Sequence, residues 1–129
     1  MARNDDLKKL SEVNLKSAVP SCGLESLSSK LVDMLILAQK MAGFQFTVTS
    51  AYRSQAYERS KGRRGTSSHC RGLAVDVSAI DSHTRFKIIA AALWSGFPRI
   101  GVGKRFLHLD IDESKAHPII FHYYDPQNT

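Results

Sequence analysis

The sequence Ser-Ser-His-Cys-Arg-Gly-Leu-Ala-Val-Asp at residues 67–76 places an imidazole, His69, seven positions before a carboxylate, Asp76. A glycine lies between them and a short apolar run leads into the acid, a pattern typical of a loop that enters a strand. A second segment, Phe-Leu-His-Leu-Asp-Ile at residues 106–111, carries another histidine and another aspartate. If the two segments meet in the fold, their polar side chains would form a metal site.

The second segment is predicted to be one strand of a β-hairpin. Residues 99–102 form a short preceding strand, and residues 103–105, Gly-Lys-Arg, have the length and glycine content of a hairpin turn. Because alternate residues of a strand project to the same face, His108 and Asp110 share one face. The opposite face is apolar and consists of Leu107, Leu109 and Ile111. A core on that apolar face would present His108 and Asp110 to a cleft.

Apolar residues that recur at intervals of three and four predict two helices. The first covers residues 24–41, and Gly43 is placed to end it. The second begins after Asp81 and ends at Gly96. Its predicted buried face consists of Phe86, Ile89, Ala90 and Leu93, and Trp94 near its end is also expected in the core. A further short helix is predicted at residues 4–16.

Alternating and β-branched residues predict further strands at residues 45–49, 73–77 and 118–124. In the last strand, His122 and Tyr124 share a face that would line the cleft, whereas Phe121 and Tyr123 are expected in the core. The predicted fold class is α+β. It consists of a small, mainly antiparallel sheet with helices packed on one side and the metal cleft on the other.

The 129 residues are predicted to form a single domain, 1–129, with an N-terminal helix and linker at about 1–22 and a tail at 125–129. A domain of this size buries roughly two-thirds of its unfolded surface. At 43% hydrophobic and 23% charged residues, the composition excludes a disordered or fibrous chain. No apolar run approaches the roughly 20 residues of a membrane-spanning helix, so membrane insertion is not expected. Without the apolar core of a signal peptide at its N-terminus, the chain is expected to be synthesised in the cytoplasm.

The net charge of +6 and the pI of about 9.6 favour an anionic partner such as nucleic acid, a membrane surface or a bacterial wall polymer. The densest basic stretch, residues 59–71, contains glycines and serines, which predict a loop rather than a recognition helix. This stretch has no aromatic residue on which bases would stack, so nucleic acid is not the expected partner. Cys22 and Cys70 are expected to be free thiols, because two cysteines make neither a disulfide framework nor a four-cysteine zinc site.

Two neutral imidazoles and one carboxylate, here His69, His108 and Asp76, are a typical catalytic zinc set, because three protein ligands leave the fourth tetrahedral position open for water. Zinc lowers the pKa of that water to about 7 and polarises a carbonyl group. Asp110 is then within plausible reach of the water as a general base. Cobalt or manganese would accept the same ligands. Spacing alone also permits a surface histidine and an aspartate that caps a turn.

The pattern Ser-x-His-x-x-Gly-x-Ala-x-Asp at residues 67–76 resembles the signature of the zinc D-alanyl-D-alanine peptidases. This family includes carboxypeptidases, D,D-dipeptidases and phage endolysins that cleave L-Ala-D-Glu bonds, and its fold is of the hedgehog type. Residues 50–54, Ser-Ala-Tyr-Arg-Ser, look like the strand-end motif of the family, and the resemblance continues at residues 101–103 and 106–110. It covers about residues 24–112.

The resemblance implies that Zn2+ is held by His69, Asp76 and His108. It also implies that Arg53 pairs with a carboxylate of the substrate, a task suited to its planar two-pronged donor, and that Ser67 hydrogen-bonds the substrate backbone. The expected function is that of a zinc-dependent peptidase that hydrolyses peptidoglycan stem peptides. The chain is expected to cleave the bond that a D-Ala-D-Ala carboxypeptidase cleaves, or the bond that an L-Ala-D-Glu or D-Ala endopeptidase cleaves.

The chain departs from many family members at Arg105, because those members carry the catalytic acid three residues before the last histidine. Shorter members resemble this chain in having His-x-Asp, which makes Asp110 the candidate base and Asp112 the less favoured substitute. If neither carboxylate reaches the water, the domain would bind zinc without hydrolysing peptides, as signalling domains of the hedgehog type are thought to do. The alternative expectation is therefore a non-catalytic zinc-containing binding domain of the same fold.

Small size, positive charge and an N-terminus unlike a signal peptide together suggest a phage-type endolysin that acts at the bacterial cell wall after release. A bacterial peptidase that stays in the cytoplasm or is exported by another route would have the same features. The expected partners are peptidoglycan peptides, and a monomer is favoured.

Overall fold

The structure is a computed structural model that describes residues 26–124, so the predicted helix at residues 4–16 and the tail lie outside the described range. Five strands form one sheet in the order β1-β2-β4-β3-β5. Their bounds are Val48–Ser50 for β1, Ala74–Ser78 for β2, Arg99–Val102 for β3, Phe106–Asp110 for β4 and Ile119–His122 for β5. Neighbouring strands are antiparallel except β3 and β5, which are parallel. The α+β class with a mainly antiparallel sheet is confirmed.

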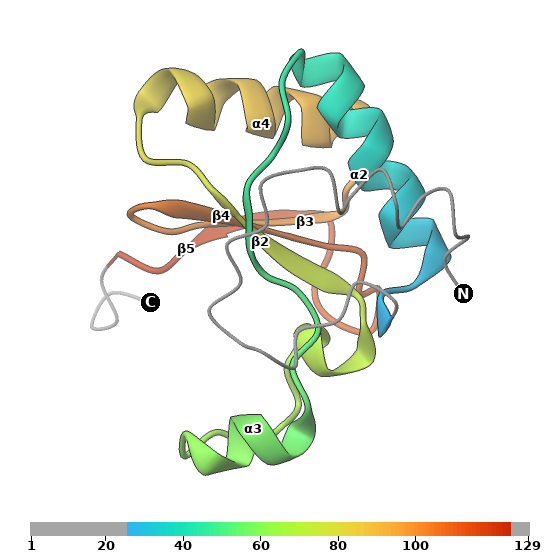
Figure 1. The fold of residues 1–129 in the computed structure, drawn as a ribbon, viewed down its shortest axis with the longest axis vertical. Coiled ribbons are helices and arrows are strands. Elements are labelled where there is room, and N and C mark those ends of the chain that lie inside the picture. Colours follow the sequence, from blue (N-terminus) through green and yellow to red (C-terminus); the bar gives the residue numbers. More distant parts are fainter. Residues whose placement is uncertain (1–25, 125–129) are drawn as a thin grey trace.

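The two long helices, α2 (Ser29–Ala42) and α4 (Ser82–Trp94), lie on one face of the sheet, and α3 (Gln55–Ser60) lies on the other (Figure 1). A 3-10 helix, η2 (Ser68–Arg71), also lies on the α3 side, next to the start of β2. The core fills the space between the sheet and the long helices. Its fully buried members include Leu31, Val32, Leu35, Val75, Val77, Ile88, Leu107 and Leu109.

Gly43 ends α2 as predicted, in the left-handed conformation with φ of 85°. The helix begins at Ser29 rather than at residue 24, because Ser28 caps it by accepting a hydrogen bond from Leu31 N at 3.1 Å. Asp81 caps α4 through Thr84 N at 2.8 Å. Among residues 26–124, no helix is long and apolar enough to cross a membrane.

The predicted buried face of α4 is wrong. Phe86, Leu93 and Trp94 are 73%, 54% and 78% exposed, and the buried residues of the helix are Ile88, Ala91 and Ala92. Apolar residues occupy most of the circumference of α4, so their spacing does not identify which side packs. The helix packs against α2 as well as the sheet, and its small alanines permit a close approach to these neighbours.

The stretch predicted as a basic loop contains the end of α3 and the whole of η2. Both are short helices that begin at serines. Ser54 Oγ accepts a hydrogen bond from Tyr57 N at 3.0 Å, and Ser67 Oγ accepts one from His69 N at 3.2 Å. Helices of one or two turns are too short to show apolar residues repeating at helical intervals. The capping serines were therefore the only local feature that indicated these helices.

The predicted orientation of β5 is also wrong. Gly101 of β3 pairs with His108 on one side and with Phe121 on the other, so Phe121 shares the face of His108. Tyr123 follows on that face and is 46% exposed, whereas His122 and Tyr124 lie on the opposite face and stack on each other at 5.8 Å. Because β5 is an edge strand, burial constrains its two faces weakly, and the alternation of residue types does not reveal which face is inward.

Replacing Gly72 with alanine is expected to lower the free energy of unfolding by about 2 kcal/mol or more. Gly72 has φ of 69°, and a Cβ there would lie 2.2 Å from the carbonyl oxygen of Ser26. Gly43→Ala is the matched control, because its φ is 85° but nothing lies within 4 Å of its Cβ position. Urea unfolding of the metal-free proteins measures both changes, and equal losses in the two variants would contradict the close contact.

Candidate metal centre

His69, Asp76 and His108 converge on the face of the sheet opposite α2 and α4. They come from η2, β2 and β4, and in the register of the sheet Asp76 lies directly across from His108. One potential ligand atom from each residue lies within 4.8 Å of the other two. The structure therefore brings together the three ligands that the sequence predicts.

The separations between these atoms suit a small metal ion. Asp76 Oδ1 lies 3.4 Å from His69 Nε2 and 3.1 Å from His108 Nδ1. Tetrahedral zinc with bonds of roughly 2.0–2.1 Å sets its ligand atoms about 3.3 Å apart. The two observed separations lie close to that value.

His69 is oriented by the backbone. Its Nδ1 lies 2.7 Å from the carbonyl oxygen of Ala51, and because a carbonyl only accepts, Nδ1 carries the hydrogen and donates it. The lone pair of Nε2 then faces Asp76. This nitrogen is buried and has no hydrogen bond partner among the described residues. An unpaired buried nitrogen is unfavourable, and a metal ion at this position would use its lone pair.

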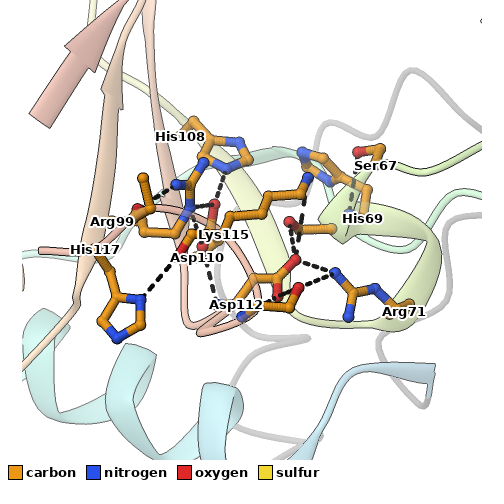
Figure 2. Close-up of polar contacts among 12 residues, drawn as sticks. Ser67, His69, Arg71, Arg99, His108, Asp110, Asp112, Lys115 and His117 are labelled. Atoms are coloured by element: carbon orange, nitrogen blue, oxygen red, sulfur yellow. Dashed lines mark hydrogen bonds and ion pairs between the residues drawn. The ribbon is translucent and has the colours of Figure 1, made fainter. Parts of the chain in front are cut away.

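His108 is oriented by Asp110. His108 Nε2 donates to Asp110 Oδ2 at 2.6 Å (Figure 2). This contact directs Nδ1 toward Asp76, whose Oδ1 lies 3.1 Å away. Asp110 also accepts from Arg99 Nε at 2.9 Å and from the backbone N–H of Asp112 at 3.0 Å, and it is fully buried. A carboxylate behind a histidine is the usual outer partner of a metal ligand.

The sequence profile of the peptidase M15 family matches residues 7–112. The chain belongs to the peptidase M15 family. The matched range contains His69, Asp76 and His108, and M15 peptidases are metal-dependent, so the family and the residue cluster agree on a metal centre. The resemblance drawn from the motif is confirmed at the level of the family. Among curated proteins, none matches the chain.

In the metal-free site, a proton on His108 offsets part of the negative charge of Asp76 and Asp110. Burial favours the neutral form of Asp76, but its hydrogen bond with His108 and its proximity to His69 outweigh burial and hold the pKa of Asp76 below its ordinary range. Burial also opposes the charged form of His108, yet its hydrogen bonds to Asp110 and Asp76 raise its pKa. A proton on His108, between two carboxylates, therefore competes with a metal ion.

The affinity for zinc is expected to rise with pH. The proton on His108 is fully present below its ordinary pKa of 6.5, and because this pKa is raised, competition persists to a higher pH and is lost above the raised value. One displaced proton weakens binding about tenfold for each pH unit below that value. Competition with a chromophoric chelator from about pH 5.5 to about pH 8.5, corrected for the protonation of the chelator, measures this slope. A constant affinity over this range would contradict the proton on His108.

A cleft of about 430 Å³ lies over the metal centre, and the predicted substrate-binding residues Arg53 and Ser67 both line it. Arg53 Nε is buried and lies 3.5 Å from Glu58 Oε2. Ser67 also caps η2, so it holds the helix that carries His69. Both residues are therefore placed beside the three ligands.

Sequence reasoning missed Glu58, which is 2% exposed at one wall of the cleft. Glu58 Oε2 accepts from Arg63 Nε at 3.0 Å and from a terminal Arg63 nitrogen at 2.8 Å, and it also faces Arg53. The hydrogen bond from Arg63 is the main cause of a lowered pKa at Glu58. One carboxylate thus holds two guanidinium groups at this wall. No helix was predicted at α3, so the sequence did not indicate that Glu58 would be buried there.

The other acidic and basic candidates lie apart from the three predicted metal ligands. Arg105 is exposed, and its carbonyl accepts from Ala79 N at 2.9 Å. Asp112 is buried, accepts from Ser68 Oγ at 2.6 Å and pairs with Arg71 (Figure 2). Asp112 therefore fastens η2 to the segment after β4.

Proposed function

We propose that the chain is a zinc-dependent peptidase that hydrolyses the stem peptides of peptidoglycan. The observation that carries the proposal is the convergence of two histidine nitrogens and one carboxylate in an open cleft of an M15 family chain. This donor set suits zinc, because one carboxylate and two imidazoles leave a coordination position open. We also propose the bacterial cell wall as the site of action, where a net charge of +6 favours approach to anionic polymers.

His69, Asp76 and His108 would hold the zinc ion. When bound, zinc polarises a carbonyl group and makes a water nucleophile available near pH 7. Arg53, held beside Glu58, would pair with a free carboxylate of the peptide, which stem peptides carry near D-glutamate and D-alanine. Ser67 would hydrogen-bond the peptide backbone. Hydrolysis consumes one water and breaks one C–N bond.

Asp110 is the general base that the sequence predicts, and its surroundings favour a different role. Both of its oxygens already accept hydrogen bonds from His108, Arg99 and the backbone, and the side chain is fully buried. A base needs an oxygen free to reach the proton of a water. We therefore infer that Asp110 acts as a positioning residue that fixes the orientation of His108.

A second candidate function is that of a zinc-containing binding domain without catalysis. Among the described residues, the carboxylates that line the cleft are Glu58, Asp76 and Asp110, and each already contacts an arginine or a histidine. A solvent-facing acid is therefore missing from the described part of the cleft. Binding of wall peptides without hydrolysis would support this candidate.

Defined peptides distinguish the two candidates. Zinc-loaded and chelated protein would be incubated with synthetic peptides that contain L-Ala-D-Glu or D-Ala-D-Ala, and newly released amine would be quantified. The proposed function predicts amine release from at least one peptide by the zinc-loaded protein alone. Zinc-dependent binding with no release from either peptide would favour the binding domain.

A further inference from the structure

The aromatic wall of the cleft contains a tyrosine that the sequence places in the core. Tyr123 follows β5 on the face of the sheet that carries the metal ligands, and it lines the cleft. Its ring packs between Phe121 and Phe106, with centroid distances of 5.5 Å and 5.3 Å. Phe121 in turn lies 5.8 Å from the ring of His108. The ring of Phe121 therefore lies between Tyr123 and the predicted ligand His108.

Gly101 explains how the aromatic rings reach this position. A Cβ at Gly101 would lie 2.7 Å from Phe121 Cε2 and 2.9 Å from Tyr123 Cε2, so any side chain there would collide with both rings. Gly101 is also the residue that pairs with His108 in the sheet. The missing side chain lets the two rings lie across β3 toward the metal centre.

The phenol group of Tyr123 lies in the same cleft as the carboxylates of Asp76 and Asp110 and is influenced by their charges. Burial, followed by the negative charges of Asp76 and Asp110, raises the pKa of Tyr123 to about 12. The hydroxyl therefore keeps its proton at neutral pH and is a hydrogen-bond donor. Among residues 26–124 this hydroxyl has no hydrogen bond partner, whereas the hydroxyl of Tyr124 donates to the carbonyl of Gly103 at 3.3 Å.

Among the charged donors that line the cleft, Arg99 and Arg63 are engaged by the protein itself, and Arg53 is assigned above to a carboxylate of the substrate. Lys115 lies 4.0 Å from Asp112 Oδ2. Arg99 binds Asp110 and the carbonyl of Ala116, and Arg63 binds Glu58. A neutral donor with a free hydrogen on the aromatic wall is suited to an oxygen on which negative charge develops during the reaction.

We propose that Tyr123 is a catalytic residue that donates a hydrogen bond to the oxygen of the scissile carbonyl. This proposal rests on the peptidase function proposed above. As water adds to the carbonyl carbon, negative charge grows on that oxygen, and the hydrogen bond becomes stronger. The C–N bond then breaks and the nitrogen leaves with a proton from the water, while Tyr123 keeps its own proton throughout.

Tyr123→Phe tests this role, because it removes the hydroxyl and keeps the ring that packs against Phe121 and Phe106. The expected result is a fall in kcat of about 10²-fold with KM changed by less than about twofold. Zinc affinity, measured by chelator competition, is expected to stay unchanged. Tyr124→Phe is the matched control, since its hydroxyl contacts Gly103 instead, and it should keep the wild-type kcat.

Several outcomes would overturn the proposal. An unchanged kcat in Tyr123→Phe, or an equal loss in Tyr124→Phe, would remove the special role of this hydroxyl. A loss of zinc affinity would indicate a metal ligand instead of a donor to substrate. A peptide phosphinate, whose tetrahedral centre mimics the carbonyl after water has added, is expected to bind Tyr123→Phe about tenfold or more weakly, and equal binding would also contradict the proposal.

A measurement on the metal-free protein separates this proposal from the proposed function. With the tyrosine ring carbons labelled, NMR titration of Tyr123 should show a pKa that falls in Asp76→Asn, because one of the charges that raises it is removed. Tyr124 should not respond. Absence of peptidase activity in the wild type would count against the proposed function, whereas a Tyr123 resonance insensitive to Asp76→Asn would overturn the placement on which this inference depends.

Discussion

His69→Ala is expected to abolish both stoichiometric zinc binding and peptidase activity while the metal-free protein still folds. His69 supplies the buried Nε2 that has no other partner within the described residues, and its loss leaves only two ligands. The fall in zinc affinity should exceed the 10–100-fold that loss of an outer partner typically causes. Metal analysis of the purified variant and chelator competition measure this effect.

The control for this variant is His83→Ala, since His83 is an exposed histidine of α4 outside the cleft. It should retain one zinc ion per chain and full activity. Circular dichroism and cooperative thermal unfolding of the metal-free proteins establish that both variants fold. Full zinc content in a folded His69→Ala protein would contradict the assignment of this ligand.

Asp110→Asn is expected to weaken zinc binding about 10–100-fold and to lower the free energy of unfolding by about 3 kcal/mol. The amide would no longer hold the Nε2 hydrogen of His108 as strongly, and Arg99 would lose its buried anionic partner. If Asp110 only positions His108, activity at saturating zinc should largely return. Zinc titrations measure the change in zinc affinity, and kinetics at several zinc concentrations measure the change in catalysis separately.

Asp112→Asn is the matched control, because Asp112 is also buried and paired with an arginine but contacts Ser68 instead of a metal ligand. It should lose stability with a smaller change in zinc affinity than Asp110→Asn. Activity of Asp110→Asn that stays lost at saturating zinc, with unchanged zinc affinity, would support the base role that the sequence predicts and would contradict the positioning role.

The hairpin and the two faces of its second strand were predictable from the sequence, whereas the meeting of the two histidine segments was implied by the family resemblance. The alternation in residues 106–110 determines that His108 and Asp110 oppose the apolar core, and the antiparallel register then sets Asp76 across from His108. Gly43 and Asp81 were sufficient to end and begin the two long helices. The hairpin and the helix ends depend on the local alternation of residue types and on capping residues, which can be read from a single sequence.

The walls of the cleft were not predictable in the same way. Tyr123 reaches the cleft because β5 is an edge strand and Gly101 leaves room, a relation between residues far apart in sequence. Glu58 becomes a buried partner of two arginines through the short helix α3, which has no apolar period. The exposed Phe86 shows the same limit, because only packing against neighbours selects the buried side of a helix whose apolar residues occupy most of its circumference.

Digestion of purified peptidoglycan, followed by mass analysis of the released fragments, tests whether the protein is a zinc-dependent peptidase of the cell wall. New termini within the stem peptides are expected when zinc is present, none are expected after chelation, and activity is expected to return when zinc is restored. The mass of each fragment also identifies the bond that is cleaved. No new termini with zinc-loaded, folded protein, or the same termini at the same rate after chelation, would contradict a zinc-dependent peptidase.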